Sequence, residues 1–143
     1  MSGCLGLAVA GAALRRRLVA VTVTGNSMLP MYRPGDRVLV LRGAVPHRDQ
    51  VVVVELPNTE RRNWNSEPAG LGSPGEPVTE RQWLLKRVSA VAGDSWGSQD
   101  EAGGRVPPDH LLLLGDNASV SFDSRQMGPF PVARVLGTVW RRL

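Results

Sequence analysis

The sequence contains a single cysteine, Cys4, so no disulfide can form within the chain and no cysteine-based metal site is expected. Its two histidines, His47 and His110, are too few and too far apart to suggest zinc. Basic residues outnumber acidic ones by 17 to 13, but they are scattered along the chain and only 5% of the residues are aromatic. A dense basic stripe with interleaved aromatic residues is therefore absent from the sequence, and we predict no nucleic-acid partner.

Lysine is equally scarce, because Lys86 is the only lysine among the 17 Lys and Arg residues. Arginine replaces lysine in most exposed roles, but it cannot give up its proton near neutral pH. Lys86 lies within the apolar segment 84–88, and burial lowers the pKa of an amine toward the range of about 7 to 8 that suits a general base. A lysine at the edge of a strand would give the same local pattern. Strand alternation directs Arg87 to the opposite face, where it is expected to meet solvent or a carboxylate.

No long hydrophobic run is present at the N-terminus. Residues 3–14 are apolar, but a membrane-spanning helix needs about 20 residues. The basic triplet 15–17 follows the apolar stretch, whereas a secretory signal carries its charge before it. A short membrane-touching helix, a truncated anchor and an ordinary packed helix all remain open. We describe residues 1–17 as a short apolar segment with a basic end and a possible weak membrane anchor.

The remaining residues, 18–143, predict one mainly β domain. Residues 58–81 are rich in Asn, Pro, Gly, Ser and Glu without apolar periodicity, which indicates a flexible, exposed insert. The spacing of the strands favours an antiparallel β-sandwich or a partly open barrel. Strands are expected at residues 18–24, 37–42, 51–56, 82–92, 111–114 and 135–142.

Two further segments lie where a strand is expected to give way to a turn. In the run from Gly25 to Pro30, the glycine allows a sharp bend and the proline ends any regular element, which presents Ser27 with unpaired backbone N–H groups around it. Such groups can stabilise an oxyanion. Residues 115–125 read GDNASVSFDSR, a loop crowded with turn-forming residues. Taken singly, each segment is equally typical of an ordinary turn.

Taken together and in this order, the three segments resemble the type I signal peptidases. The shared motifs are G-x-S-M-x-P around Ser27, K-R at 86–87 with G-D six residues later, and G-D-N-x₃-S-x-D-S-R from Gly115. The Gram-positive and mitochondrial inner-membrane branches are the most similar, and the resemblance extends over residues 22–139. Met31 departs from the family pattern, which usually has threonine at this position.

The resemblance implies a signal-peptidase-like β fold and a serine endopeptidase with no metal or organic cofactor. Ser27 corresponds to the nucleophile and Lys86 to the general base of a Ser–Lys dyad, while Ser121 corresponds to a hydroxyl that orients the lysine amine. The backbone N–H of Ser27 is one oxyanion donor; some relatives add a hydroxyl at the position of Gly25, so the second donor is unidentified here. The remaining site residues are the ion pair Asp123 and Arg125, the bracing turn residues Asp116 and Asn117, and the substrate-binding residues Met28 and Gly25.

The same resemblance implies an extended segment of a precursor protein as the substrate, cut after small residues. It also implies a possible membrane surface as a partner, with the catalytic domain on the extracytoplasmic side. Because no full transmembrane span is present in the sequence, a cytoplasmic location stays open. Two alternatives to a general signal peptidase also remain, a maturation protease dedicated to one precursor and a non-catalytic β-rich binding module. The oligomeric state is undetermined.

Overall fold

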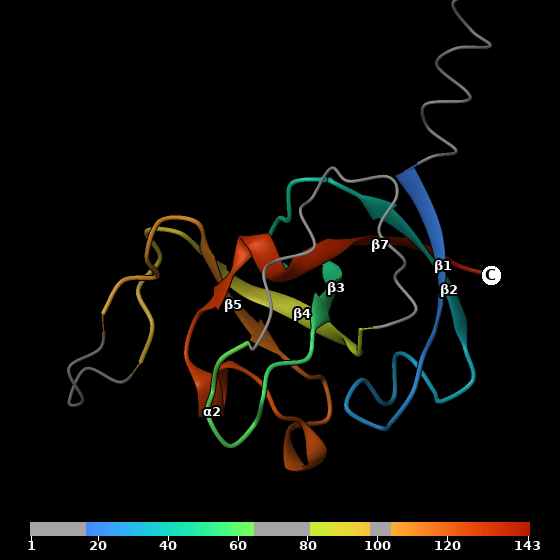
Figure 1. The fold of residues 1–143 in the computed structure, drawn as a ribbon, viewed down its shortest axis with the longest axis horizontal. Coiled ribbons are helices and arrows are strands. Elements are labelled where there is room, and N and C mark those ends of the chain that lie inside the picture. Colours follow the sequence, from blue (N-terminus) through green and yellow to red (C-terminus); the bar gives the residue numbers. More distant parts are fainter. Residues whose placement is uncertain (1–16, 65–80, 98–103) are drawn as a thin grey trace, which may run out of the picture.

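A computed structural model describes residues 17–64, 81–97 and 104–143. Seven strands of these residues form one antiparallel sheet in the order β1-β2-β7-β3-β4-β5-β6, and the sheet curls into a partly open barrel (Figure 1). The predicted mainly β, antiparallel fold is confirmed. The strands are β1 Leu18–Thr22, β2 Arg37–Arg42, β3 Val51–Glu55, β4 Trp83–Val91, β5 His110–Leu114, β6 Phe130–Pro131 and β7 Val135–Arg142.

Each of the six expected strands is present, with ends within two residues of those predicted. The short strand β6 was not expected, because its two residues are too few for alternation to be visible in a sequence. Helix α2, Ser124–Met127, was also not expected. The described residues also form the 3-10 turns η2 Ala118–Val120 and η3 Val132–Arg134. None of the helices in the described part of the chain is long and apolar enough to cross a membrane.

Two parts of the sequence-based prediction concern segments that lie largely outside the described residues. The N-terminal segment 1–17, with its expected short helix, lies outside the described residues except for its last position. The insert predicted at 58–81 also lies mostly outside them, since residues 65–80 are not described.

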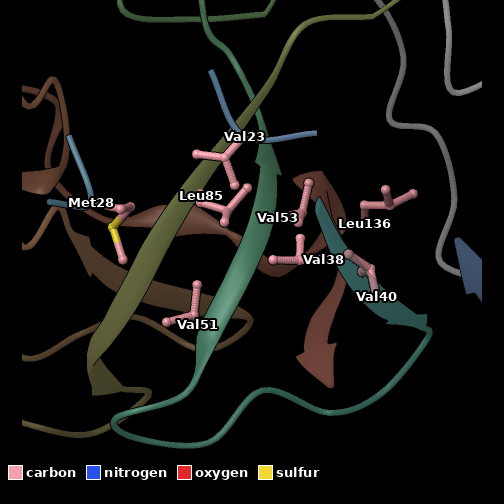
Figure 2. Packing of buried hydrophobic residues seen from close by; sticks show 8 residues of the cluster. All are labelled: Val23, Met28, Val38, Val40, Val51, Val53, Leu85 and Leu136. Atoms are coloured by element: carbon pink, nitrogen blue, oxygen red, sulfur yellow. The ribbon is translucent and has the colours of Figure 1, made fainter. Parts of the chain in front are cut away.

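Strand β3 is the centre of the fold, and all five of its residues are buried. Its side chains alternate between the two faces of the sheet. Val51 and Val53 join one apolar cluster with Met28 and Leu85, shown in Figure 2, while Val52 and Val54 join a second cluster on the other face. The run of four valines therefore reflects a strand that is covered on both sides.

Glu55, the last residue of β3, forms a buried anchor, which we call the Glu55 anchor. Its carboxylate lies 3.1 Å from an NH1 nitrogen of Arg81 and 3.1 Å from one of Arg134. Its backbone carbonyl accepts a hydrogen bond of 3.1 Å from the indole of Trp64, and the Arg134 guanidinium lies over the same indole ring. A carboxylate that is only 7% exposed is thus kept in charged contacts.

Candidate active site

The turn that carries Ser27 follows directly after β1. Gly25 has a φ of +74°, a left-handed conformation that strains any residue with a Cβ atom. A one-turn structure follows, in which the N–H of Leu29 donates to the carbonyl of Asn26 at 3.2 Å. Gly25 thus allows the chain to reverse, and Ser27 stands on the turn as the sequence predicted.

Lys86 approaches this turn from the middle of β4. Its Nζ lies 3.0 Å from Oγ of Ser27, and only 1% of Lys86 is exposed. This is the one hydrogen bond of the amine within the described residues. By strand alternation the lysine stem lies between Leu84 and Val88, which belong to the second apolar cluster. A positive charge on the Lys86 amine would therefore be poorly solvated.

This burial lowers the pKa of Lys86 from its ordinary 10.5 to about 8. The negative charge of Asp123 acts in the opposite direction, and the positive charge of Arg125 adds to the lowering. An amine with a pKa near 8 is partly neutral at physiological pH, and a neutral amine can accept the proton of a hydroxyl. The geometry and the pKa together allow Lys86 to act as a base toward Ser27.

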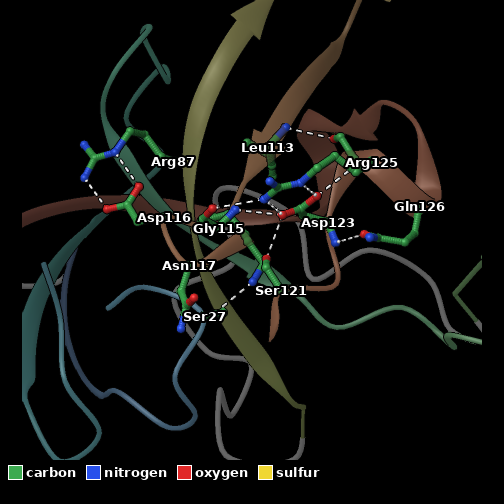
Figure 3. Close-up of polar contacts among 12 residues, drawn as sticks. Ser27, Arg87, Leu113, Gly115, Asp116, Asn117, Ser121, Asp123, Arg125 and Gln126 are labelled. Atoms are coloured by element: carbon green, nitrogen blue, oxygen red, sulfur yellow. Dashed lines mark hydrogen bonds and ion pairs between the residues drawn. The ribbon is translucent and has the colours of Figure 1, made fainter. Parts of the chain in front are cut away.

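Asp123 is fully buried and organises the loop beside Ser27 and Lys86 (Figure 3). Its Oδ2 accepts hydrogen bonds from Ser121 Oγ at 2.6 Å and from the N–H of Gly115 at 2.8 Å, and the Arg125 guanidinium donates to both of its oxygens. Burial alone would raise the pKa of Asp123, but these bonds outweigh burial and hold the pKa well below its usual range. The loop therefore carries a fixed negative charge.

The structure gives Ser121 a different partner from the one that the family resemblance implied. Its hydroxyl donates to Asp123, and no hydrogen bond joins it to Lys86 within the described residues. Because its hydrogen is committed, the oxygen of Ser121 has only acceptor capacity left.

Gly115 lies where the turn that carries Ser27 meets the Asp123 loop. A Cβ atom at this position would overlap with Ser121 Oγ, and it would lie 2.6 Å from Ser121 Cβ and 2.8 Å from the carbonyl oxygen of Ser27. Real Cβ atoms essentially never approach other atoms so closely. Only glycine therefore lets the loop and the Ser27 turn pack this tightly.

Asn117 connects the same loop to the Ser27 turn by two hydrogen bonds. Its backbone N–H donates to the carbonyl of Ser27 at 2.8 Å, and its side-chain amide donates to the carbonyl of Asn26 at 3.0 Å. Asn117 thus holds the backbone carbonyls of both Asn26 and Ser27, which lie on either side of the Ser27 nitrogen and α-carbon.

Asp116 lies on the face of β4 opposite to Lys86 and accepts two hydrogen bonds from Arg87, of 2.9 and 2.8 Å. Arg87 also donates to the backbone carbonyl of Asp49 at 2.8 Å. The arginine beside Lys86 therefore meets a carboxylate on the opposite face of β4, in agreement with the alternation of the strand.

Ser27 and Lys86 line a groove of about 420 Å³. Residues 24–26 and 82–84 also line it, and its apolar side is formed by Leu56, Val120 and Phe122. Sequence reasoning missed these three apolar residues; the signal was present in Val120 and Phe122, which flank Ser121 in a loop that otherwise has little apolar character.

Met28 does not belong to this groove, which corrects its assignment as a substrate-binding residue. It is 1% exposed and packs in the apolar cluster with Val23 and Leu85. The physical reason is the turn itself, in which Ser27 faces the groove while the next side chain points into the core. Gly25 does line the groove, but it contributes backbone alone.

Within the described residues no group of three or more His, Cys, Asp or Glu side chains could hold a metal ion.

Comparison with known proteins yields two family matches. The family described as "Signal peptidase, peptidase S26" matches residues 96–143, and the family described as "Peptidase S24-like" matches residues 7–62. Together the two segments contain Ser27 and the Asp123 loop, while Lys86 lies between them.

Similar proteins are subunits of a mitochondrial protease. The chain is 29% identical over 119 residues to mitochondrial inner membrane protease subunit 2 of Mus musculus and 29% identical over 127 residues to that of Danio rerio. It is 32% identical over 72 residues to subunit 1 of Schizosaccharomyces pombe. These alignments cover 81%, 87% and 46% of the chain, and 61%, 63% and 46% of the respective relatives. The chain thus spans about half to three-fifths of the length of these relatives.

Proposed function

The chain belongs to the type I signal peptidase family, and on this premise we propose that it is a serine endopeptidase that uses Ser27 as nucleophile and Lys86 as general base. The observation that carries the proposal is the 3.0 Å contact between the buried amine and the hydroxyl. Burial lowers the pKa of that amine to about 8, so a useful fraction is neutral near pH 7.

The chemistry follows from these two groups. Ser27 Oγ attacks the scissile carbonyl carbon while its proton passes to Nζ of Lys86, and the carbonyl π electrons move onto oxygen. When the oxyanion collapses, the C–N bond breaks and the ammonium of Lys86 protonates the leaving amine. A water molecule then attacks the acyl-enzyme and gives its proton to Lys86, and the released Ser27 recovers that proton.

Ser121 suits a supporting role in this cycle. A neutral amine has one lone pair and two N–H bonds, and the lone pair is needed for the hydroxyl of Ser27. The oxygen of Ser121 can only accept, since its hydrogen is donated to Asp123 at 2.6 Å. It would therefore favour the orientation of the amine in which an N–H points to Ser121 and the lone pair points to Ser27. In this proposal Asp123 and Arg125 hold Ser121 in place.

The sheet offers an edge on which an extended substrate could lie. The pairing of β4 with β5 begins at Arg87, whereas the pairing of β4 with β3 begins at Trp83. Among the described residues, positions 83–86 of β4 therefore have a strand on one side only, and they lie beside the groove of Ser27. An added peptide strand would bind by main-chain hydrogen bonds and would place its scissile bond near the dyad.

The substrate that we propose is a leader or signal peptide, or a propeptide, of a precursor protein, cut after small residues. The narrow apolar wall of Leu56, Val120 and Phe122 is compatible with small aliphatic side chains. Since the relatives are named as inner membrane proteases, we propose that the chain acts at a membrane surface. A dedicated maturation protease would have the same dyad, and it would differ in accepting one precursor only.

The test is a cleavage assay on a peptide that contains an Ala-x-Ala site, with the wild type, Ser27→Ala and Lys86→Arg. The wild type should cleave after the second alanine, and both variants should lose activity by a factor of about 10³ or more. Lys86→Arg is the sharper variant because it keeps the positive charge and removes only the base. Equal turnover by all three proteins would rule out the dyad. A wild type that binds the peptide without cleaving it would favour a non-catalytic binding module.

A further inference from the structure

The turn that carries Asn26 and Ser27, which we call the nucleophile turn, has both hydrogen-bonded and free polar groups. The carbonyls of Asn26 and Ser27 both accept hydrogen bonds from Asn117. Because a trans peptide unit is planar, with its C=O and N–H pointing in opposite directions, the N–H of Ser27 points away from Asn117. Within the described residues this N–H has no hydrogen-bond partner. It is thus a free donor of fixed direction at the nucleophile.

One backbone donor leaves the charge of a tetrahedral oxyanion only partly compensated, since such sites normally present two donors. Three residues precede Ser27 along the groove, Thr24, Gly25 and Asn26. Gly25 has no side chain, and the hydroxyl of Thr24 stands three positions from the nucleophile. The side chain of Asn26 is adjacent to the nucleophile and carries two N–H bonds.

The amide of Asn26 is also uncommitted. Its side chain is exposed and lines the groove, and it makes no hydrogen bond within the part of the chain that the structure describes. Asn117 offers a contrast, because its side-chain amide is used to hold the carbonyl of Asn26. The backbone of Asn26 is thereby fixed while its side chain stays available to a ligand.

We propose that the side-chain amide of Asn26 is the second oxyanion donor, acting beside the backbone N–H of Ser27. This inference rests on the proposed Ser–Lys chemistry. As Ser27 Oγ bonds to the scissile carbon, the electron pair of the C=O π bond passes to oxygen, and Nδ2 of Asn26 donates a hydrogen bond to the resulting anion. The amide is neutral, so it stabilises the oxyanion without adding a charge that would shift the pKa of Lys86.

The test compares Asn26→Ala and Asn26→Asp with Thr24→Val and with Asn63→Ala, an exposed asparagine outside the groove. The kcat of Asn26→Ala should fall by about 10²- to 10³-fold, while KM changes little, because the donor acts on the transition state. Asn26→Asp, which has no N–H and adds a negative charge, should be at least as impaired. Asn63→Ala should stay close to the wild type, and Thr24→Val should lose much less kcat than Asn26→Ala.

A second readout separates catalysis from structure. A peptide ending in an alanine aldehyde adds to Ser27 and forms a tetrahedral adduct whose former carbonyl oxygen occupies the oxyanion position, so inhibition by the aldehyde should weaken in Asn26→Ala in parallel with kcat. The affinity for the corresponding peptide acid, which forms no adduct, should not change. Thermal unfolding of each variant identifies any loss of the folded state.

An Asn26→Ala enzyme that keeps its kcat within about threefold of the wild type would overturn the inference and leave the dyad intact. A selective loss in Thr24→Val would overturn it in favour of the threonine hydroxyl. A wild type that neither cleaves peptides nor binds the aldehyde would overturn the proposed function itself, and the inference with it.

Discussion

The amine of Lys86 and the hydroxyl of Ser27 lie 3.0 Å apart although three strands separate their elements in the sheet. Ser27 follows β1 and Lys86 lies in β4, with β2, β7 and β3 between them. In a flat sheet four strand spacings amount to about 19 Å. The contact therefore depends on the curl of the sheet, which brings the turn after β1 over the face of β4.

The first prediction concerns pH. In the proposed mechanism activity requires the neutral amine of Lys86, whose pKa is lowered to about 8. We expect kcat/KM to rise about tenfold for each pH unit between pH 6 and 7, to bend near pH 8 and to level off above pH 9. Initial rates at low substrate concentration measure this profile. A rate that is flat between pH 6 and 9 would contradict the role of Lys86.

The second prediction is that Lys86→Met stabilises the protein near neutral pH. A lowering of the pKa from 10.5 to about 8 means that the buried ammonium costs about 3 kcal/mol of folding free energy. The cost is present below pH 8 and disappears as the pH rises toward 10.5, because the native state then loses its proton before the unfolded chain does. The variant should gain up to about 3 kcal/mol at pH 7 and lose this advantage near pH 10.

Urea unfolding at the two pH values measures that gain. Leu84→Met, at a neighbouring position on the same strand, is the matched control and should show no such dependence on pH. An inactive Lys86→Met protein that is less stable than the wild type at pH 7 would show that the amine is solvated well enough to bear its charge.

The third prediction concerns Gly115→Ala. The added methyl group would collide with Ser121 and with the carbonyl of Ser27, so the loop and the nucleophile turn would have to separate. A misplacement of about 1 Å is expected to reduce kcat by about 10²-fold or more. Gly104→Ala is the control, because its Cβ atom would meet only the indole nitrogen of Trp96, at an ordinary 3.7 Å. If both alanine variants have the kcat of the wild type, the close packing at Gly115 is dispensable.

The fourth prediction concerns Asp123→Asn. The loss of the charged hydrogen bonds from Arg125, Ser121 and Gly115 should lower the free energy of unfolding by about 2 to 3 kcal/mol at pH 7. Because the pKa of Asp123 is depressed, its contribution is complete above the ordinary carboxyl pKa of about 4 and is lost as the pH falls further. The variant should therefore be less sensitive to acid than the wild type.

Asp94→Asn is the matched control for that substitution. Asp94 pairs with Arg48, whose side chain is 59% exposed, and an exposed ion pair contributes little to stability because solvent screens it. Equal losses of stability in the two variants, measured by urea unfolding from pH 3 to 7, would argue against a special role for the buried carboxylate.

Much of the fold could be predicted because strands carry local signals. In the sequence, the valine run of β3 predicts a strand and the glycine before Ser27 predicts a turn. Helix α2 was missed although it has a capping box, in which Asp123 accepts from the N–H of Arg125 and Gln126 accepts from the N–H of Asp123. The spacing of Asp123 and Gln126 was visible, but no apolar run follows to support a helix.

The site was less predictable where it depends on three-dimensional packing. The sequence indicated that Lys86 is buried and that Ser27 is on a turn, but their distance follows from the curl of the sheet. The burial of Met28 depends on the direction that the chain takes after Ser27, which no local pattern encodes. The hydroxyl of Ser121 donates to Asp123, and this partner follows from the way the loop folds, which no local pattern in the sequence encodes.

The Glu55 anchor bears on how this chain can change its length. Trp64 and Arg81 stand at the two ends of the stretch between them, and both bind Glu55. One buried residue of β3 therefore fixes both Trp64 and Arg81, whatever the length of chain that joins them. Loop closure adds only about 0.6 kcal/mol for each doubling of loop length. This stretch is therefore the place where evolution could insert a further domain, or an experimenter a fluorescent reporter, without displacing Lys86.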